Sequence, residues 1–140
     1  MNTRSLSLAA IAGFAALASL ATRGDAHHAF AAEFDATKPV AVQGVVTQAR
    51  FVNPHSWIYL DVKDKDGSVT NWGFEFGTPS SLKTSGLERT DLKAGTPVSV
   101  SGFRAKNGGP FGYATNLTLP GNRKIRTGGA PDAPTAPAAR

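Results

Sequence analysis

The sequence contains no cysteine among its 140 residues. This absence excludes disulfide bonds, iron–sulfur clusters, thiolate zinc sites and a cysteine nucleophile, so any metal must bind to histidine, carboxylate or backbone ligands. Histidine is also scarce, with three residues at positions 27, 28 and 55, and no carboxylate has an identifiable partner for general acid–base catalysis. We therefore expect a protein that is not an enzyme and that has no organic cofactor.

A long apolar run is also missing. The stretch from Leu6 to Leu20 is shorter than the ~20 residues that a membrane-spanning helix needs. Arg4 precedes it, and Gly24-Asp25-Ala26 follows as a small-x-small cleavage site, which is the pattern of a secretory signal peptide. We expect residues 1–26 to be removed and the mature protein to be periplasmic or secreted, without a transmembrane segment. Cleavage after Ala21 is the alternative.

The charge of the chain does not indicate a nucleic-acid partner. Lysine and arginine number 15 against 10 acidic residues, a net charge of +5. The basic residues are scattered, apart from Arg123, Lys124 and Arg126 near the end, whereas a nucleic-acid surface clusters them. The 114 residues that follow the signal are enough for one domain with a modest core.

Alternation of apolar and polar residues predicts five short strands, over residues 40–47, 56–62, 68–76, 97–104 and 113–119. Thr78 followed by Pro79 marks the start of a short helix that ends at Gly86, between the third and fourth strands. This all-β pattern matches a small five-stranded OB-like Greek-key barrel. We expect an N-terminal arm over 27–37, the barrel and its extension over 38–127, and a disordered tail rich in Pro, Ala and Gly over 128–140.

The histidines are the candidate metal ligands. Cleavage after Ala26 would leave His27 with a free α-amine beside two imidazoles, a nitrogen-rich set that suits Cu(II), Ni(II) or Zn(II), with copper favoured by the Irving–Williams order. Pro54 makes a rigid corner that aims His55, so the three histidines can converge. Glu33 and Glu75 are candidate additional ligands. The alternatives are a solvated histidine tail and a His55 that only caps the corner.

A second candidate function uses the predicted strand over residues 56–62. Trp57 and Tyr59 alternate with aliphatic residues and should face outward, where with Asn53 they could bind a protein, a polysaccharide or a small planar ligand of the cell envelope. The favoured alternative is that an arm carrying Phe30 and Phe34 covers these two aromatic rings.

Five short motifs stand out along the chain: His27-His28-Ala29-Phe30, Glu33-Phe34-Asp35, Lys38-Pro39, Asn53-Pro54-His55-Ser56-Trp57 and Ile58-Tyr59-Leu60-Asp61-Val62. Together they resemble the motifs of a family of small exported bacterial proteins known as domain of unknown function 6152. The resemblance covers nearly the whole expected mature domain and implies an export signal and a β-rich fold, but no established activity. The strand–turn–strand pattern is loosely similar to exported bacterial OB-fold proteins, a likeness of fold alone.

Overall fold

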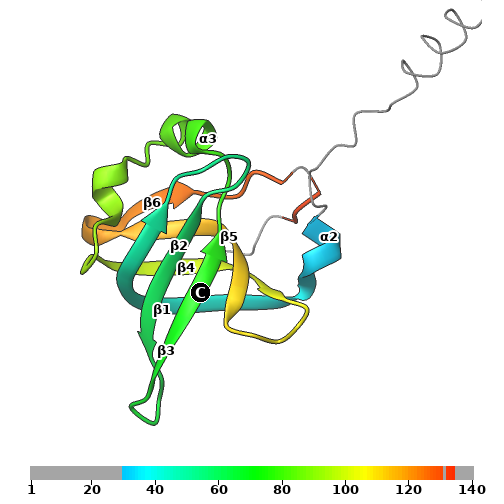
Figure 1. The fold of residues 1–140 in the computed structure, drawn as a ribbon, viewed down its shortest axis with the longest axis vertical. Coiled ribbons are helices and arrows are strands. Elements are labelled where there is room, and N and C mark those ends of the chain that lie inside the picture. The colour runs from blue at the N-terminus through cyan, green and yellow to red at the C-terminus, as the bar shows by residue number, and fades with distance from the viewer. Residues whose placement is uncertain (1–29, 131, 135–140) are drawn as a thin grey trace, which may run out of the picture.

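A computed structural model describes residues 30–130 and 132–134. The expected signal peptide, His27 and His28 lie outside the described residues. The described chain is mostly antiparallel β-sheet with a few short helices (Figure 1). In chain order the elements are α2 (Phe30–Glu33), β1 (Phe34–Arg50), β2 (Trp57–Lys63), β3 (Val69–Glu75), α3 (Pro79–Thr84), the 3₁₀ helix η1 (Arg89–Leu92), β4 (Pro97–Ala105), β5 (Phe111–Leu119), the 3₁₀ helix η2 (Pro120–Asn122) and β6 (Arg123–Arg126).

The long strand β1 organises the sheet because it has two neighbours. Its first part pairs with β4 as far as Val45, and from Val45 onward it pairs with β2. Gly44 lies at this change of partner, where a Cβ atom would come within 2.6 Å of the Asp61 carbonyl oxygen, so a residue without a side chain is required. A register shift follows between Val46 and Gln48.

The strand order is β3-β2-β1-β4-β5-β6, and β3 also pairs in parallel with β5. This extra pairing means that the sheet curls until its third and fifth strands lie side by side (Figure 1). The main core lies on the concave side of this curl, since alternate residues of β2 and β4 point there. Its most buried members are Val46, Ile58, Leu60, Phe74, Phe76, Leu82, Val100, Ala114 and Leu117. Trp72 is half-buried and packs against this core.

A second, smaller core lies outside the first and holds the N-terminal turn of helix. It consists of Phe30, Phe34, Phe103, Ala105 and Tyr113. The ring of Phe30 lies 5.3 Å from that of Tyr113 and 5.4 Å from that of Phe103, measured between centroids. The expectation that Phe30 and Phe34 cover Trp57 and Tyr59 is therefore wrong. The two phenylalanines pack instead on β4 and β5, against the rings of Phe103 and Tyr113.

Three features of the described chain differ from those expected from the sequence: the number of strands, the start of the first strand and the start of the C-terminal tail. The described residues form six strands, not five, because β6 pairs with the last residues of β5. β1 begins at Phe34, inside the segment expected to be an arm, and Phe34 is paired with Ala105 of β4. The tyrosine hydroxyl of Tyr113 accepts hydrogen bonds from the backbone nitrogens of Gly129 and Ala130, so the start of the expected tail is held against the second core. None of the helices in the described part of the chain is long and apolar enough to cross a membrane.

Candidate functional site

The side chains of His55 and Glu75 form the most buried polar pair that could carry chemistry. The Nδ1 atom of His55 lies 2.6 Å from Oε1 of Glu75, and these side chains are 19% and 8% exposed. His55 belongs to the loop of residues 51–56 between β1 and β2, and Glu75 is the last residue of β3. The two meet because Trp57, just after the loop, is the register partner of Glu75.

Backbone hydrogen bonds hold the loop beside the end of β3. The Ser56 nitrogen donates to the Gly77 carbonyl oxygen at 3.1 Å, and the Phe76 nitrogen donates to the Ser56 carbonyl oxygen at 2.8 Å. The hydrogen-bond pattern of the sheet thus continues past the start of β2 and the end of β3. The loop turns at the peptide bond between Asn53 and Pro54, which is cis. The position of the imidazole is therefore fixed by the backbone on its C-terminal side.

Burial and, to a smaller extent, the nearby negative charge of Glu33 together raise the pKa of Glu75 to about 7. Burial is the larger cause, because an ionised carboxylate loses favourable hydration when it is removed from water. Glu75 is also the register partner of Tyr113 on β5, and their proximity contributes to the raised pKa of the Tyr113 hydroxyl, after the larger effect of burial. Glu75 is thus surrounded by residues from three different parts of the chain.

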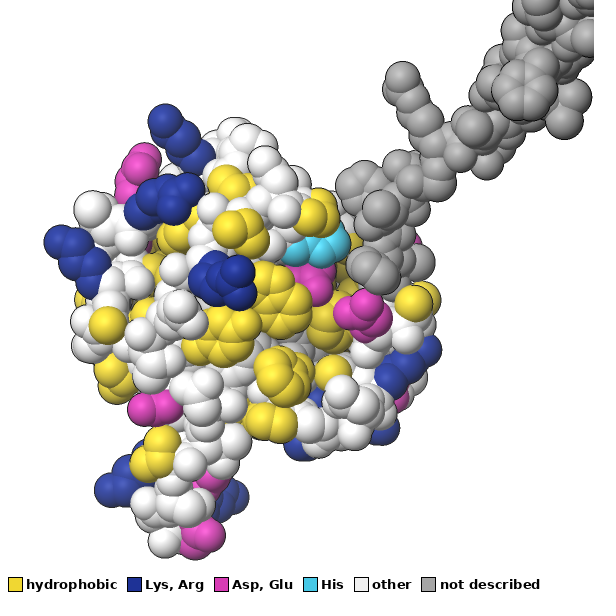
Figure 2. Space-filling view, in the orientation of Figure 1, with side chains coloured by type: hydrophobic (Ala, Val, Ile, Leu, Met, Phe, Trp, Pro, Cys, Tyr) yellow, Lys and Arg dark blue, Asp and Glu magenta, His cyan; other side chains and the backbone are white. Residues whose placement is uncertain are grey.

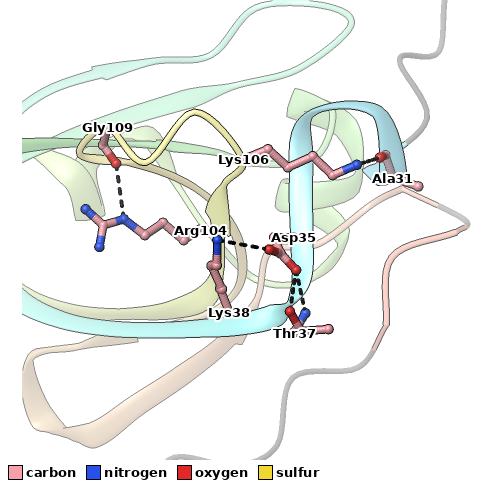
Figure 3. Close-up of polar contacts among 7 residues, drawn as sticks. All are labelled: Ala31, Asp35, Thr37, Lys38, Arg104, Lys106 and Gly109. Atoms are coloured by element: carbon pink, nitrogen blue, oxygen red, sulfur yellow. Dashed lines mark hydrogen bonds and ion pairs between the residues drawn. The ribbon is translucent and has the colours of Figure 1, made fainter.

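Glu33 approaches this pair because the turn of helix that carries it is fixed to the hairpin between β4 and β5. The Lys106 nitrogen donates to the Glu33 carbonyl oxygen at 2.9 Å, and the Lys106 ammonium donates to the Ala31 carbonyl oxygen at 2.5 Å (Figure 3). In the next turn of chain, Asp35 accepts hydrogen bonds from the nitrogen and hydroxyl of Thr37 (Figure 3). Helix α2 is therefore held by its backbone as well as by Phe30.

The structure brings together part of the predicted metal set. His55 and Glu75 are in contact, and Glu33 is close enough for its charge to act on Glu75. His27 and His28 lie outside the described residues. Within residues 30–130 and 132–134, no group of three or more histidine or acidic side chains is arranged to hold a metal ion. Asn53, expected on a ligand face, is exposed in the loop before His55.

The outer face of β2 and β3 carries an aromatic surface beside this pair. The rings of Trp57 and Tyr59 are nearly parallel, with 17° between their planes and 6.4 Å between their centroids. Phe111, at the start of β5, is 40% exposed, and a hollow of about 380 Å³ is lined by Ala32, Glu33, Phe34, Trp57, Ala105, Lys106, Asn107 and Phe111. Figure 2 shows hydrophobic side chains gathered in the middle of this face, with a histidine and acidic side chains at their border.

Sequence reasoning found Trp57 and Tyr59 but missed Phe111. The available signal was Gly73, a glycine inside a strand, which commonly marks a close approach by another group. A Cβ atom at Gly73 would lie 2.8 Å from the Phe111 ring and 3.2 Å from the Tyr59 ring. Gly73 therefore leaves room for two aromatic rings.

The hydroxyl of Ser56 and the imidazole of His55, next to each other in the sequence, differ in their exposure to solvent. The hydroxyl nearest in sequence to His55, that of Ser56, is buried and has no hydrogen-bond partner in the described structure, so a substrate cannot reach it. The imidazole, in contrast, is partly exposed, and its Nδ1 atom lies against the Glu75 carboxylate, which orients the ring.

Comparison with known proteins gives a family but no activity. No curated protein and no solved structure matches the chain. The model of one family, described as a family of unknown function, matches residues 15–114, which include His27, His28, His55 and both aromatic residues of β2. The match covers more than half of the chain, and the chain therefore belongs to the family of unknown function DUF6152.

Proposed function

We propose that the protein binds a metal ion, with Cu(II) preferred, through His55 and the two histidines of its mature N-terminus. The observation that carries this proposal is the contact of 2.6 Å between Nδ1 of His55 and the buried carboxylate of Glu75. Histidines that bind metals almost always donate their other ring N–H to such a group, which fixes the tautomer and the direction of the ligating nitrogen.

The anchoring of Phe30 supports the convergence of the three histidines. Its ring packs on Tyr113, the register neighbour of Glu75. An extended chain spans at most ~3.3–3.6 Å per residue, so the Cα atom of His28 lies within roughly 7 Å of that of Phe30, and that of His27 within roughly 11 Å. This length of chain lets the proposed site include the end of β3, where Glu33 and Glu75 add negative charge.

The same proposal includes export and processing. Removal of residues 1–26 by a signal peptidase would create the α-amine of His27 and deliver the protein to the periplasm or the exterior. Amine and imidazole nitrogens suit the tetragonal geometry of Cu(II) better than the tetrahedral geometry of Zn(II). The role is one of binding, without catalysis and without an organic cofactor.

We also propose that the curled sheet is an OB-like Greek-key barrel with an added sixth strand. The strand order, the parallel pairing of β3 with β5 and the position of α3 between β3 and β4 support this. A barrel of this size is filled by its own side chains, so ligands bind at its outer surface or its ends.

Calorimetric titration of the correctly processed protein with Cu(II) and with Zn(II) tests the proposal. We expect one high-affinity Cu(II) site, weaker Zn(II) binding and a large loss of affinity in His55→Ala. Glu75→Gln keeps the size of the side chain but weakens the orientation of the imidazole, and should reduce affinity by ~10–100-fold. Val52→Ala, in the same loop and 41% exposed, is the matched control and should bind as the wild type does.

Two results would contradict the proposal: no Cu(II) binding by the processed protein, or equal affinity after all three histidines are replaced. A protein that begins at Thr22 separates the contributions. It retains the imidazoles but has no amine at residue 27, so it should bind Cu(II) more weakly than the protein that begins at His27.

A further inference from the structure

Three partly exposed aromatic side chains lie close together on the outer face of β2, β3 and β5. Tyr59 and Phe111 both approach the backbone of Gly73, since a Cβ atom there would be within 3.2 Å of each ring. The plane of Trp57 is tilted by only 17° from that of Tyr59. We call the rings of Trp57, Tyr59 and Phe111 the aromatic platform, and each of them is accessible to solvent in part.

Polar side chains of mixed character border the aromatic platform. Gln48 and Arg50 of β1 are exposed and are the register partners of Tyr59 and Trp57. On the other side, Asp61 accepts a hydrogen bond of 2.7 Å from the Asn71 amide. At the hollow beside Trp57 the polar side chains are those of Glu33, Lys106 and Asn107. The border thus offers both hydrogen-bond donors and acceptors, and its charges are of both signs.

This balance of charge selects the class of ligand. Single-stranded nucleic acids also stack on aromatic side chains, but their binding depends on lysine and arginine residues that follow the phosphates. Here the border carries two basic residues, Arg50 and Lys106, and two acidic residues, Asp61 and Glu33. An uncharged polymer with flat faces and many hydroxyl groups can contact the aromatic platform and its mixed polar border without electrostatic repulsion.

We propose that the aromatic platform of Trp57, Tyr59 and Phe111 is a binding site for neutral glycan chains, whose sugar rings stack on the aromatic faces while their hydroxyl groups bond with the polar border. This site is adjacent to the His55–Glu75 pair but does not use it. Glycan binding is therefore independent of the proposed metal and should persist in the presence of a chelator.

Calorimetric titration of the processed protein with chitotetraose and with cellotetraose, in a buffer that contains EDTA, tests the proposal. We expect at least one of the two glycans to bind, and Trp57→Ala and Phe111→Ala each to weaken that binding about tenfold, because each substitution removes one ring on which a sugar stacks. Both side chains reach the surface, so both variants should fold, and circular dichroism checks this. Val69→Ala, on β3 and 61% exposed, is the control and should leave binding unchanged.

Gly73→Ala tests whether glycan binding requires the close packing of the rings on the sheet, because it removes none of the three rings. The added methyl group would displace Tyr59 and Phe111 from the sheet, and glycan binding should fall although all three rings remain. Failure of both glycans to bind would overturn the proposal, as would binding that Trp57→Ala and Phe111→Ala leave unchanged. Tighter binding of oligodeoxythymidine than of either glycan would also overturn it and would assign the platform to single-stranded nucleic acid.

Discussion

Replacement of Phe30 by alanine tests whether the N-terminal turn of helix is anchored as described. The Phe30 side chain is 3% exposed and its ring contacts those of Phe34, Phe103 and Tyr113 at centroid distances of 5.3–5.6 Å. Truncation of a buried phenylalanine to alanine costs ~3–5 kcal/mol. The second core is small and lies at the edge of the molecule, where neighbours relax more easily, so we expect a loss near ~3 kcal/mol.

Urea denaturation followed by circular dichroism measures this loss, and thermal melting should show Tm lower by roughly 12–24 °C, at ~4–8 °C per kcal/mol for a domain of about this size. Phe111→Ala, which removes a ring that is 40% exposed, is the control and should cost less than about 1 kcal/mol. A loss below about 1 kcal/mol for Phe30→Ala as well would refute the packing described for the second core. In the folded variant, Cu(II) affinity should also fall, because the proposed metal site requires the anchored Phe30 to hold the N-terminal histidines within reach of His55.

Three further substitutions test other parts of the structure. Ser56→Ala should raise the free energy of unfolding by about 1 kcal/mol, because it removes a buried hydroxyl that has no hydrogen-bond partner in the described structure; lower stability in urea would show that this hydroxyl is satisfied. Gly102→Ala should cost at least ~3 kcal/mol or prevent folding, since its Cβ atom would lie 1.8 Å from the Tyr113 carbonyl oxygen, and an unchanged Tm would contradict this contact. Glu75 has a folded-state pKa of about 7, above its ordinary 4.5, so it favours the folded state at low pH and this contribution, at most ~3 kcal/mol, is lost as the pH rises through 7. In the presence of EDTA, the stability of the wild type should therefore fall relative to that of Glu75→Gln between about pH 5 and pH 8, and parallel curves would exclude the raised pKa.

The strands that alternate regularly could be predicted from the sequence, and the others could not. β2 and β4 place an apolar residue at every second position, and Thr78 with Pro79 marks the start of α3. β6 has a single buried residue, Ile125, between charged neighbours, which is too short a pattern to recognise. The first residues of β1 are exposed on both faces from Ala36 to Pro39, so they have no alternation to detect.

The candidate site could be predicted only in part, because its residues meet through strand register. His55 is conspicuous as the one histidine far from the N-terminus, and alternation correctly places Glu75 opposite the main core. Alternation suggests that such a residue is exposed, whereas Glu75 is 6% exposed because the second core and the loop of His55 cover it. Phe30 and Phe34 pack on Phe103 and Tyr113, which are distant in the sequence. No local sequence pattern indicates that these four residues meet, so the surface that the two phenylalanines cover could not be predicted.

Pulsed electron paramagnetic resonance of the Cu(II)-loaded, processed protein tests whether His55 binds copper together with the N-terminal histidines, since it detects the remote nitrogen of each imidazole bound to copper. We expect signals from more than one coordinated imidazole in the wild type and the loss of one of them in His55→Ala, with Val52→Ala unchanged. A spectrum of His55→Ala identical to that of the wild type would show that His55 is not a ligand, and it would contradict the metal site proposed here.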